Sequence, residues 1–318
     1  MSELFIELFS EEMPPNLQIN ARNQLKKLFS EELSLVNLSY KDLEIYSTPT
    51  RLTIFISGLP KKIKILPSEV KGPKLGVPQN IVENFARSKN ASIDDLYEKK
   101  LEKGTFYFIK LKGKEINTED ELIKIIPKSL NEISWKKSMK WSDHDLSWGR
   151  PLRSILSIFD KKHLKFKYAH LETENFTLIE KDDEIKQKKI KDFEEYLKFL
   201  KQNEIILDHN KRAKFISEKI QSICRSRSYQ TLVNESLLLE VSNLVDKPRI
   251  ILAKFDKNYL KLPKEVIKST LQFHQRYFTL LDQKDRMINE FIIVANKQDA
   301  KKLIKLGNER VVEARLSD

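Results

Sequence analysis

Segments with the period of a strand and segments with the period of a helix alternate along this chain, and some strands are joined by short turns. Residues 4–8, 50–57, 105–111 and 249–255 have strand-like patterns, and a polar turn at 282–286 joins two more at 276–281 and 291–296. Helical spacing of apolar residues marks 17–33, 122–133, 208–223 and 235–245. Because hairpins pair antiparallel, this order predicts an α+β fold with largely antiparallel sheets rather than a doubly wound one.

The length of the chain, 318 residues, is enough for two domains with separate cores. Residues 171–194 are rich in Glu, Lys and Asp and have few large apolar side chains. We therefore expect an N-terminal α+β domain at 1–170, a charged linker at 171–194 and a second α+β domain at 195–318.

Glycine is scarce, and its spacing excludes one kind of site. The chain has 7 glycines, and no two of them have the GxG or Walker spacing that lets backbone amides surround a phosphate. The sequence therefore predicts that this chain does not itself bind ATP or a dinucleotide.

The charge balance points to an anionic partner. The formal net charge is +12, with 33% charged residues, which favours nucleic acid or an anionic surface. One cysteine, Cys224, excludes an internal disulfide framework and a cysteine-rich zinc site, as expected for a reducing cytoplasm. The acidic start and the lack of a long apolar run predict neither an export signal nor a membrane-spanning helix.

Residues 138–154, SMKWSDHDLSWGRPLRS, place two indoles among cations. Trp141 and Trp148 suit stacking on bases, while Lys140, Arg150 and Arg153 suit contacts with phosphate. The alternative is that the tryptophans anchor a core and the cations form its solvated rim. Composition alone does not decide between these two interpretations.

A second segment, QFHQRYF at 272–278, also interleaves cations with rings. His274 and Arg276 lie between aromatic residues, which suits a grip on RNA. The same pattern fits a strand buried on one face, so both interpretations stay open.

The sequence gives less support to catalytic or metal-binding sites than to RNA-binding ones. The Asp-His-Asp run at 143–145 lacks the spacing of a metal site, and the adjacent Glu11 and Glu12 do not converge on one reacting atom. Cys224 has no visible histidine partner and is interpreted as a packed thiol. We therefore predict no catalytic residue and no metal ligand, and expect the chain to bind or position rather than cleave.

Several segments, spread over nearly the whole chain, carry a resemblance to a known family. They are FIELFSEEMPP (5–15), STPTRLTIFISGL (47–59), KGP (71–73), NFARSKN (84–90), the segment 138–154, NESLLLEVSNLVDKP (234–248), LPKEVIKSTLQFHQRYFTL (262–280), FIIVAN (291–296) and GNERVVEARLSD (307–318). In this order they resemble the beta subunit of bacterial glycyl-tRNA synthetase.

This resemblance implies a heterotetramer of two alpha and two beta subunits. In that family the alpha subunit makes glycyl-adenylate from glycine and ATP, with Mg, and the beta subunit recognises tRNA(Gly). ATP and Mg are therefore expected in the alpha subunit, with no cofactor bound by this chain. The first half of such beta subunits is also similar to the editing-type domain of the phenylalanyl-tRNA synthetase beta subunit.

The sequence departs from that family in two places. Residues 170–183, HLETENFTLIEKDD, stand where the family has a glycine-histidine-arginine-phenylalanine turn. The family also continues beyond the position of residue 318 into a helical domain similar to HD-type phosphohydrolases and an anticodon-binding domain. We expect a fragment without anticodon recognition.

The sequence therefore predicts a noncatalytic, tRNA-handling part of the ligase. Two alternatives are an editing-type aminoacyl-tRNA deacylase and a module that only docks the alpha subunit. The candidate RNA-binding residues are Arg51, Lys140, Trp141, Arg150, Arg153, His274 and Arg276.

Overall fold

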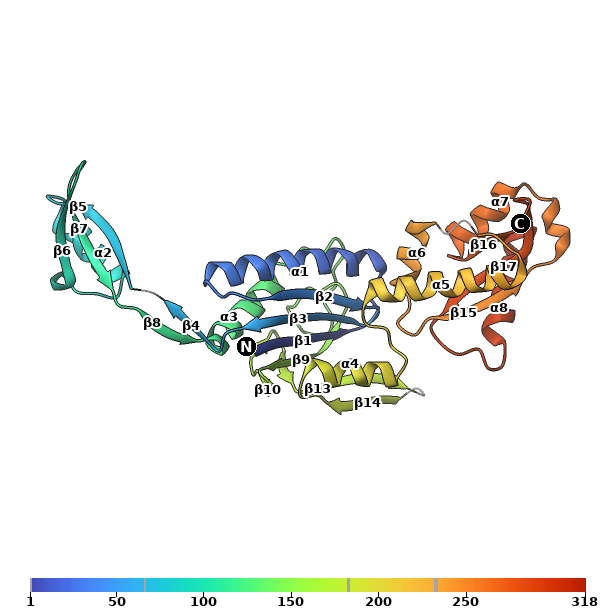
Figure 1. Ribbon diagram of the computed structural model, residues 1–318, viewed down its shortest axis with the longest axis horizontal. Coiled ribbons are helices and arrows are strands. Elements are labelled where there is room, and N and C mark those ends of the chain that lie inside the picture. Colours follow the sequence, from blue (N-terminus) through green and yellow to red (C-terminus); the bar gives the residue numbers. More distant parts are fainter. Residues whose placement is uncertain (1, 66, 182–183, 232–233) are drawn as a thin grey trace.

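The computed structural model describes residues 2–65, 67–181, 184–231 and 234–318. Figure 1 shows an elongated molecule in three parts: a central body (2–61 and 118–207), an arm (62–117), and a C-terminal unit (208–318) at the end opposite the arm. Apart from one parallel pair, β9 with β12, the described strands pair antiparallel, so the predicted α+β class is confirmed. No helix in the described residues is both long and apolar enough to cross a membrane.

The body is built on a seven-stranded sheet with β1 near its centre. The strand order is β11-β12-β9-β1-β3-β2, and β10 adds to β9. The strands are β1 (Ser2–Ser10), β2 (Asp42–Thr48), β3 (Arg51–Leu59), β9 (Leu152–Phe159), β10 (Lys162–His163), β11 (Lys167–Tyr168) and β12 (Leu171–Glu174).

Strand β1 is buried on both faces, whereas its alternating pattern predicted a half-buried strand. Leu4, Ile6 and Leu8 pack in one core cluster with the helices α1 (Pro15–Leu35) and α3 (Thr118–Asn131). Phe5 packs on the opposite face against α4 (Phe193–Gln202). The polar member of the alternation, Glu7, is also buried, because it has partners inside the protein.

The predicted linker is instead folded onto the body. Residues 171–194 contain β12, a hairpin of β13 (Phe176–Lys181) and β14 (Glu184–Lys189), and the start of α4; residues 182 and 183 lie outside the described residues. Thr177 and Ile179 are buried, while Lys188 and Lys189 are exposed. The charged composition therefore belongs to the solvated face of a packed hairpin.

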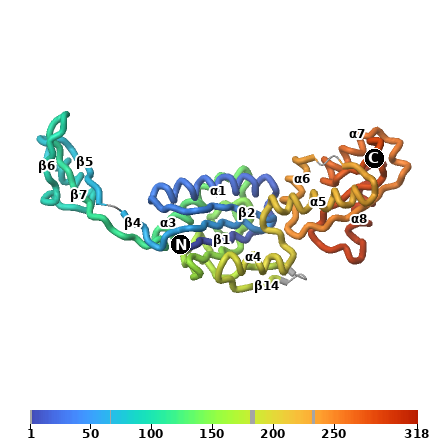
Figure 2. The backbone as a smooth tube through the Cα atoms, viewed as in Figure 1, coloured from blue at the N-terminus to red at the C-terminus, as the bar shows by residue number. Residues whose placement is uncertain are grey.

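The arm leaves the body between β3 and α3. A ribbon of β4 (Lys62–Ile65) and β8 (Lys114–Asn117) carries a three-stranded sheet, β5-β7-β6, with one helix. These elements are β5 (Ser68–Lys74), α2 (Gln79–Ser88), the 3-10 turn Ile93–Asp95, β6 (Leu96–Leu101) and β7 (Gly104–Leu111). The backbone trace in Figure 2 shows the arm extending away from the body.

The C-terminal unit packs helices on a small antiparallel sheet of order β15-β17-β16. The predicted strand at 249–255 is β15 (Arg249–Lys254), and the predicted hairpin is formed by β16 (Phe278–Leu281) and β17 (Met287–Ala295). Its helices are α5 (His209–Arg227), α6 (Glu235–Ser242), α7 (Lys264–Ser269) and α8 (Leu303–Ser317), with a 3-10 turn at Lys257–Lys261 and a π-helical turn at Thr270–His274.

A buried polar cluster joins the body to the C-terminal unit. We call Gln18, Arg22, Ser47, Arg212 and Asn243 the junction cluster. The Gln18 amide donates to the carbonyl of Asn243 at 2.7 Å, and Arg22 donates to the Asn243 side chain at 3.0 Å and to the Ser47 hydroxyl. The Arg212 guanidinium donates to the carbonyl of Ser47 at 3.0 Å. The cluster therefore ties α1 and β2 to α5 and to the end of α6.

Replacing Arg212 by Gln should destabilise the fold by about 3–5 kcal/mol, the usual cost of removing one partner from a buried charged network. The guanidinium is fully buried and donates to four carbonyl groups, those of Ser47, Ile206, Leu207 and Ser242. Urea unfolding followed by circular dichroism measures the loss. The neighbouring exposed cation gives the control, because Lys211→Gln should change the free energy of unfolding by less than about 0.5 kcal/mol. Equal effects of the two substitutions would contradict a structural role for Arg212.

His209 should make the stability depend on pH. Burial, together with Arg22 and Arg212, lowers the pKa of His209 from 6.5 to about 4, so the folded protein holds this ring neutral at pH 7. The unfolded chain binds the extra proton, so stability is complete above about pH 6.5 and is lost as the pH falls towards 4, by up to about 3 kcal/mol. Urea midpoints at pH 7.5 and 5.0 should therefore differ more for the wild type than for His209→Gln. The same pH-dependent loss in both proteins would exclude His209 as its source.

Candidate nucleic-acid interface

The loop between α3 and β9 contains the first candidate segment, and one of its tryptophans is a core residue. Trp148 is 1% exposed and packs against Trp135 at a ring distance of 4.8 Å and against Tyr168 at 6.0 Å. Backbone hydrogen bonds between Met139 and Trp148 hold the loop closed. A Cβ atom on Gly149 would lie 2.6 Å from the Trp135 ring, so this position requires glycine. The core-anchor interpretation therefore holds for Trp148.

Trp141 is only partly buried, and it lies beside two stacked histidines. The rings of His144 and His170 are 3.6 Å apart and parallel to within 2°, and Trp141 meets both of them edge-on. Burial, and then the neighbouring His144, lower the pKa of His170. His170 therefore favours the neutral imidazole, which can stack but adds no charge.

The cations of this segment differ in the number of carboxylates that they contact. Lys140 is exposed and 3.9 Å from the Asp145 carboxylate, and Arg150 is partly buried and donates to the carbonyl of Gly149 at 2.8 Å. Arg153 lies between two carboxylates, Glu11 at 3.4 Å and Glu180 at 3.3 Å. Lys140 and Arg150 thus have more freedom than Arg153 to reach a phosphate.

Two further lysines near this segment were not singled out from the sequence. Lys136 and Lys137 are exposed and directly precede the segment. The run WKKSMKW, residues 135–141, was the available signal, since it places three lysines between two indoles.

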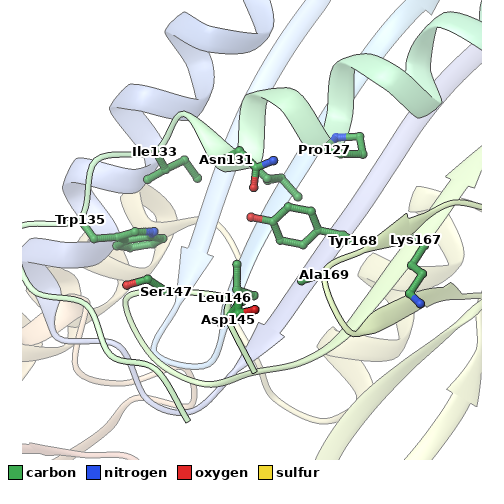
Figure 3. Close-up of a pocket in the computed structure, with 11 residues that line it drawn as sticks. Pro127, Asn131, Ile133, Trp135, Asp145, Leu146, Ser147, Lys167, Tyr168 and Ala169 are labelled. Carbon is green, nitrogen blue, oxygen red and sulfur yellow. The ribbon is translucent and has the colours of Figure 1, made fainter. Parts of the chain in front are cut away.

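A pocket of about 450 Å³ is lined by the end of α3, by the loop residues 145–147, and by β11 with the adjacent Ala169. Figure 3 shows the rings of Tyr168 and Trp135 on its wall, with the Lys167 amine and the Asp145 carboxylate at its edge. Burial raises the pKa of Tyr168 to about 12, so its hydroxyl is a neutral hydrogen-bond donor at pH 7. The residues described around the pocket combine ring faces with one amine and one carboxylate, which suits a planar polar group such as a nucleobase.

Arg51, a predicted RNA-binding residue, is buried instead. It is 2% exposed, and its guanidinium pairs with Glu7 at 3.2 Å and with Asp246 at 3.5 Å. It also lies 4.9 Å from the centre of the Phe9 ring. These contacts are all internal, so Arg51 is not available to a bound nucleic acid.

The second candidate segment divides between surface and core. Tyr277 and Phe278 are buried in the cores of the C-terminal unit, whereas Phe273 is 69% exposed and His274 is exposed. The segment begins in the π-helical turn and becomes a strand only at its last residue, Phe278, so the interpretation as a strand buried on one face is wrong for residues 272–277.

Arg276 fixes the turn between these two halves. Its φ is +57°, and its guanidinium donates to the carbonyl of Phe273 at 2.8 Å and to Glu240 at 3.0 Å. Because Arg276 already pairs with Glu240, it is less available to a ligand than the exposed side chains of Phe273 and His274.

Two of the catalytic candidates, Glu11 and Cys224, have contacts that fit a structural role. Within the described residues, no three His, Cys, Asp or Glu side chains are grouped as metal ligands. Glu11 pairs with Arg153, and Cys224 is buried, which raises the pKa of its thiol.

Comparison with known proteins gives a consistent result. The family described as "Glycyl-tRNA synthetase beta subunit" matches residues 4–318. Proteins named glycine–tRNA ligase beta subunit from Rickettsia felis and Rickettsia prowazekii are each 35% identical to this chain over its whole length. Each match covers 48% of the relative, so the chain spans about half the length of the curated relatives that it matches. The predicted resemblance is confirmed, and the chain belongs to the glycyl-tRNA synthetase beta subunit family.

Proposed function

We propose that this chain binds and positions tRNA(Gly) for glycine–tRNA ligase, while a separate alpha subunit carries out the ATP-dependent chemistry. The single observation that supports this most strongly is the family match over residues 4–318. The scarcity and spacing of glycine agree with this division of labour, because phosphate-binding loops depend on closely spaced glycines.

The contacts of the body support an RNA-facing surface around Trp141. Lys136, Lys137 and Lys140 are exposed next to this partly buried indole, and the pocket beside Tyr168 adds ring faces. Cations position a phosphate backbone, while rings and pockets accept bases. In this proposal Lys140, Trp141 and Arg150 contact the tRNA from the body, and His274 contacts it from the C-terminal unit.

The proposed assembly has two alpha and two beta subunits and works in the cytoplasm. ATP and Mg bind in the alpha subunit. The editing-type and docking-only alternatives gain no specific support from the contacts described above, and both are separated from the proposal by the experiments below.

Replacing Lys140 and Arg150 together by Gln should weaken tRNA binding and flatten its salt dependence. Each lost phosphate contact lowers the slope of log K against log salt by about 0.7–0.9. Fluorescence anisotropy with labelled tRNA(Gly) over a KCl series measures this slope. The matched control, Lys198→Gln with Lys214→Gln, removes the same charge from exposed positions on α4 and α5 and should leave the slope unchanged. An unchanged slope in the Lys140/Arg150 variant would assign that segment to folding alone.

Adding this chain to a purified alpha subunit should raise the formation of glycyl-tRNA, but not the ATP–pyrophosphate exchange that reports glycyl-adenylate. The physical reason is that only the tRNA-dependent step uses the cationic surface. Activation of glycine by the chain alone would overturn the proposal. Release of amino acid from mischarged tRNA by the chain alone would favour the deacylase, and binding of the alpha subunit without binding of tRNA would favour the docking module.

A further inference from the structure

The β5-β7-β6 sheet of the arm has three aromatic residues on a single face. In the antiparallel register, Phe108 of the central strand lies opposite Lys71 on one side and Tyr97 on the other, and Phe106 lies opposite Lys99. Directly paired residues share a face, as do alternate residues of one strand. Tyr97, Phe106 and Phe108 therefore lie together with Lys71, Lys99 and Lys110. We call this the ring face.

The helix of the arm covers the opposite face. Gly72 follows Lys71 in β5 and so points away from the ring face, and a Cβ atom there would lie 2.5 Å from the Phe85 ring of α2. Val82 and Ala86 of the same helix are buried, as is Ile109, which alternates with Phe108 in β7. The sheet thus has one face packed against α2 and one face without a covering helix in the described residues.

Lysine side chains, rather than apolar ones, lie over the rings. The Lys71 amine is 3.5 Å from the centre of the Phe106 ring, Lys99 is 5.2 Å from Phe108, and Lys110 is 5.4 Å from Tyr97. All three lysines are exposed, so this face is in contact with solvent. Phe106 and Tyr97 are partly exposed beneath them, whereas Phe108 is buried.

One carboxylate of β5 orients the ring face. Glu69 accepts hydrogen bonds from the Tyr97 hydroxyl and from the Lys99 amine, the latter at 2.5 Å. Glu69 therefore neutralises Lys99 and fixes the Tyr97 ring. Lys110 lies opposite Glu69 in the register and attracts it, but no direct ion pair joins the two in the described part of the arm. Lys71 and Lys110 are therefore the cations of the ring face that a ligand can reach, within an arm that carries twelve Lys and Arg residues against seven Asp and Glu.

We propose that the ring face of the arm binds unpaired nucleotides of RNA. A partly exposed ring stacks on any base, and an adjacent ammonium group pairs with the phosphate of the same strand. A base that stacks on Phe106 takes the place of the Lys71 amine, which then reaches the neighbouring phosphate. A purely apolar partner would instead bury these ammonium groups without counter-charges, at a cost in free energy.

Because the arm extends away from the body, the ring face would contact a different part of the RNA from the part that the body contacts. The arm lies at the far end of the molecule from the C-terminal unit (Figure 1). The inference rests on the proposed handling of tRNA, and it adds that an unpaired segment of that RNA is bound away from the body.

An unstructured RNA, a fluorescein-labelled dodecamer of uridine, tests this proposal with the intact 318-residue chain. The variant Lys71→Gln with Lys110→Gln should bind it more weakly, with a salt slope reduced by about 0.7 for each contact. Phe106→Leu keeps an apolar side chain but removes the ring, and should lower the affinity by roughly tenfold. A 12-base-pair RNA duplex, whose bases are already stacked, should show little effect of Phe106→Leu.

Two controls separate the ring face from general charge and from folding. Lys89→Gln with Lys100→Gln removes the same charge at the end of α2 and on the helix-covered face, and should leave the salt slope unchanged. Urea unfolding of each variant excludes loss of structure. Independently, photo-crosslinking of RNA that contains 5-iodouridine should give adducts at Tyr97 or Phe106, mapped by mass spectrometry.

Unchanged binding of the dodecamer by both test variants, with crosslinks elsewhere, would overturn this inference. If the same variants instead lost the alpha subunit on co-purification, the ring face would be a protein interface. Neither result touches the proposed function, which is tested separately by the binding of full tRNA(Gly) to the Lys140/Arg150 variant and by the assay of glycine activation by the chain alone.

Discussion

Buried charge is the constraint on which the arrangement of this molecule depends. Arg51 and Arg212 are both inside the protein, and a buried guanidinium group is stable only when its donors are met by carboxylates or carbonyls. Arg51 finds Glu7 in the same sheet and Asp246 in the C-terminal unit, while Arg212 finds carbonyls on both sides of the same boundary. The two larger parts of the molecule are therefore held together by polar contacts that few other arrangements could satisfy.

Periodicity predicted ten elements of this fold, the strands β1, β3, β7, β15, β16 and β17 and the helices α1, α3, α5 and α6, but it did not predict their environments. The alternation at 4–8 correctly marks a strand, yet the polar Glu7 is buried because its partner Arg51 arrives from β3. Likewise, the hairpin at 176–189 has the composition of a linker, because only a few of its residues are buried. Local patterns report the conformation of the backbone, whereas burial depends on contacts that are distant in the sequence.

In the candidate site, too, the local sequence did not show which side chains are buried. Trp141 and Trp148 are alike in sequence context, and both contact other rings, but only Trp148 is buried. The sequence predicts Arg51 as an RNA-binding surface cation, because nothing in its local sequence distinguishes a buried arginine from an exposed one. Its partner Asp246 lies far away in the sequence, so the ion pair that buries Arg51 could not be predicted. The ring face was missed because its strands carry many lysines, and their grouping depends on the register of three strands.

The way in which the arm joins the body has a consequence for how such chains can vary. The amide of Thr118 donates to the carbonyl of Lys61 at 3.0 Å, and the Thr118 hydroxyl donates to the carbonyl of Pro60 at 2.6 Å, so the two ends of the arm meet at a closed joint. The entropy cost of closing such an insertion rises only with the logarithm of its length. The arm could therefore be removed, lengthened or replaced at this joint while the interior of the seven-stranded sheet stays intact. A chain with this fold can gain or lose a binding specificity at this position without changes in the body.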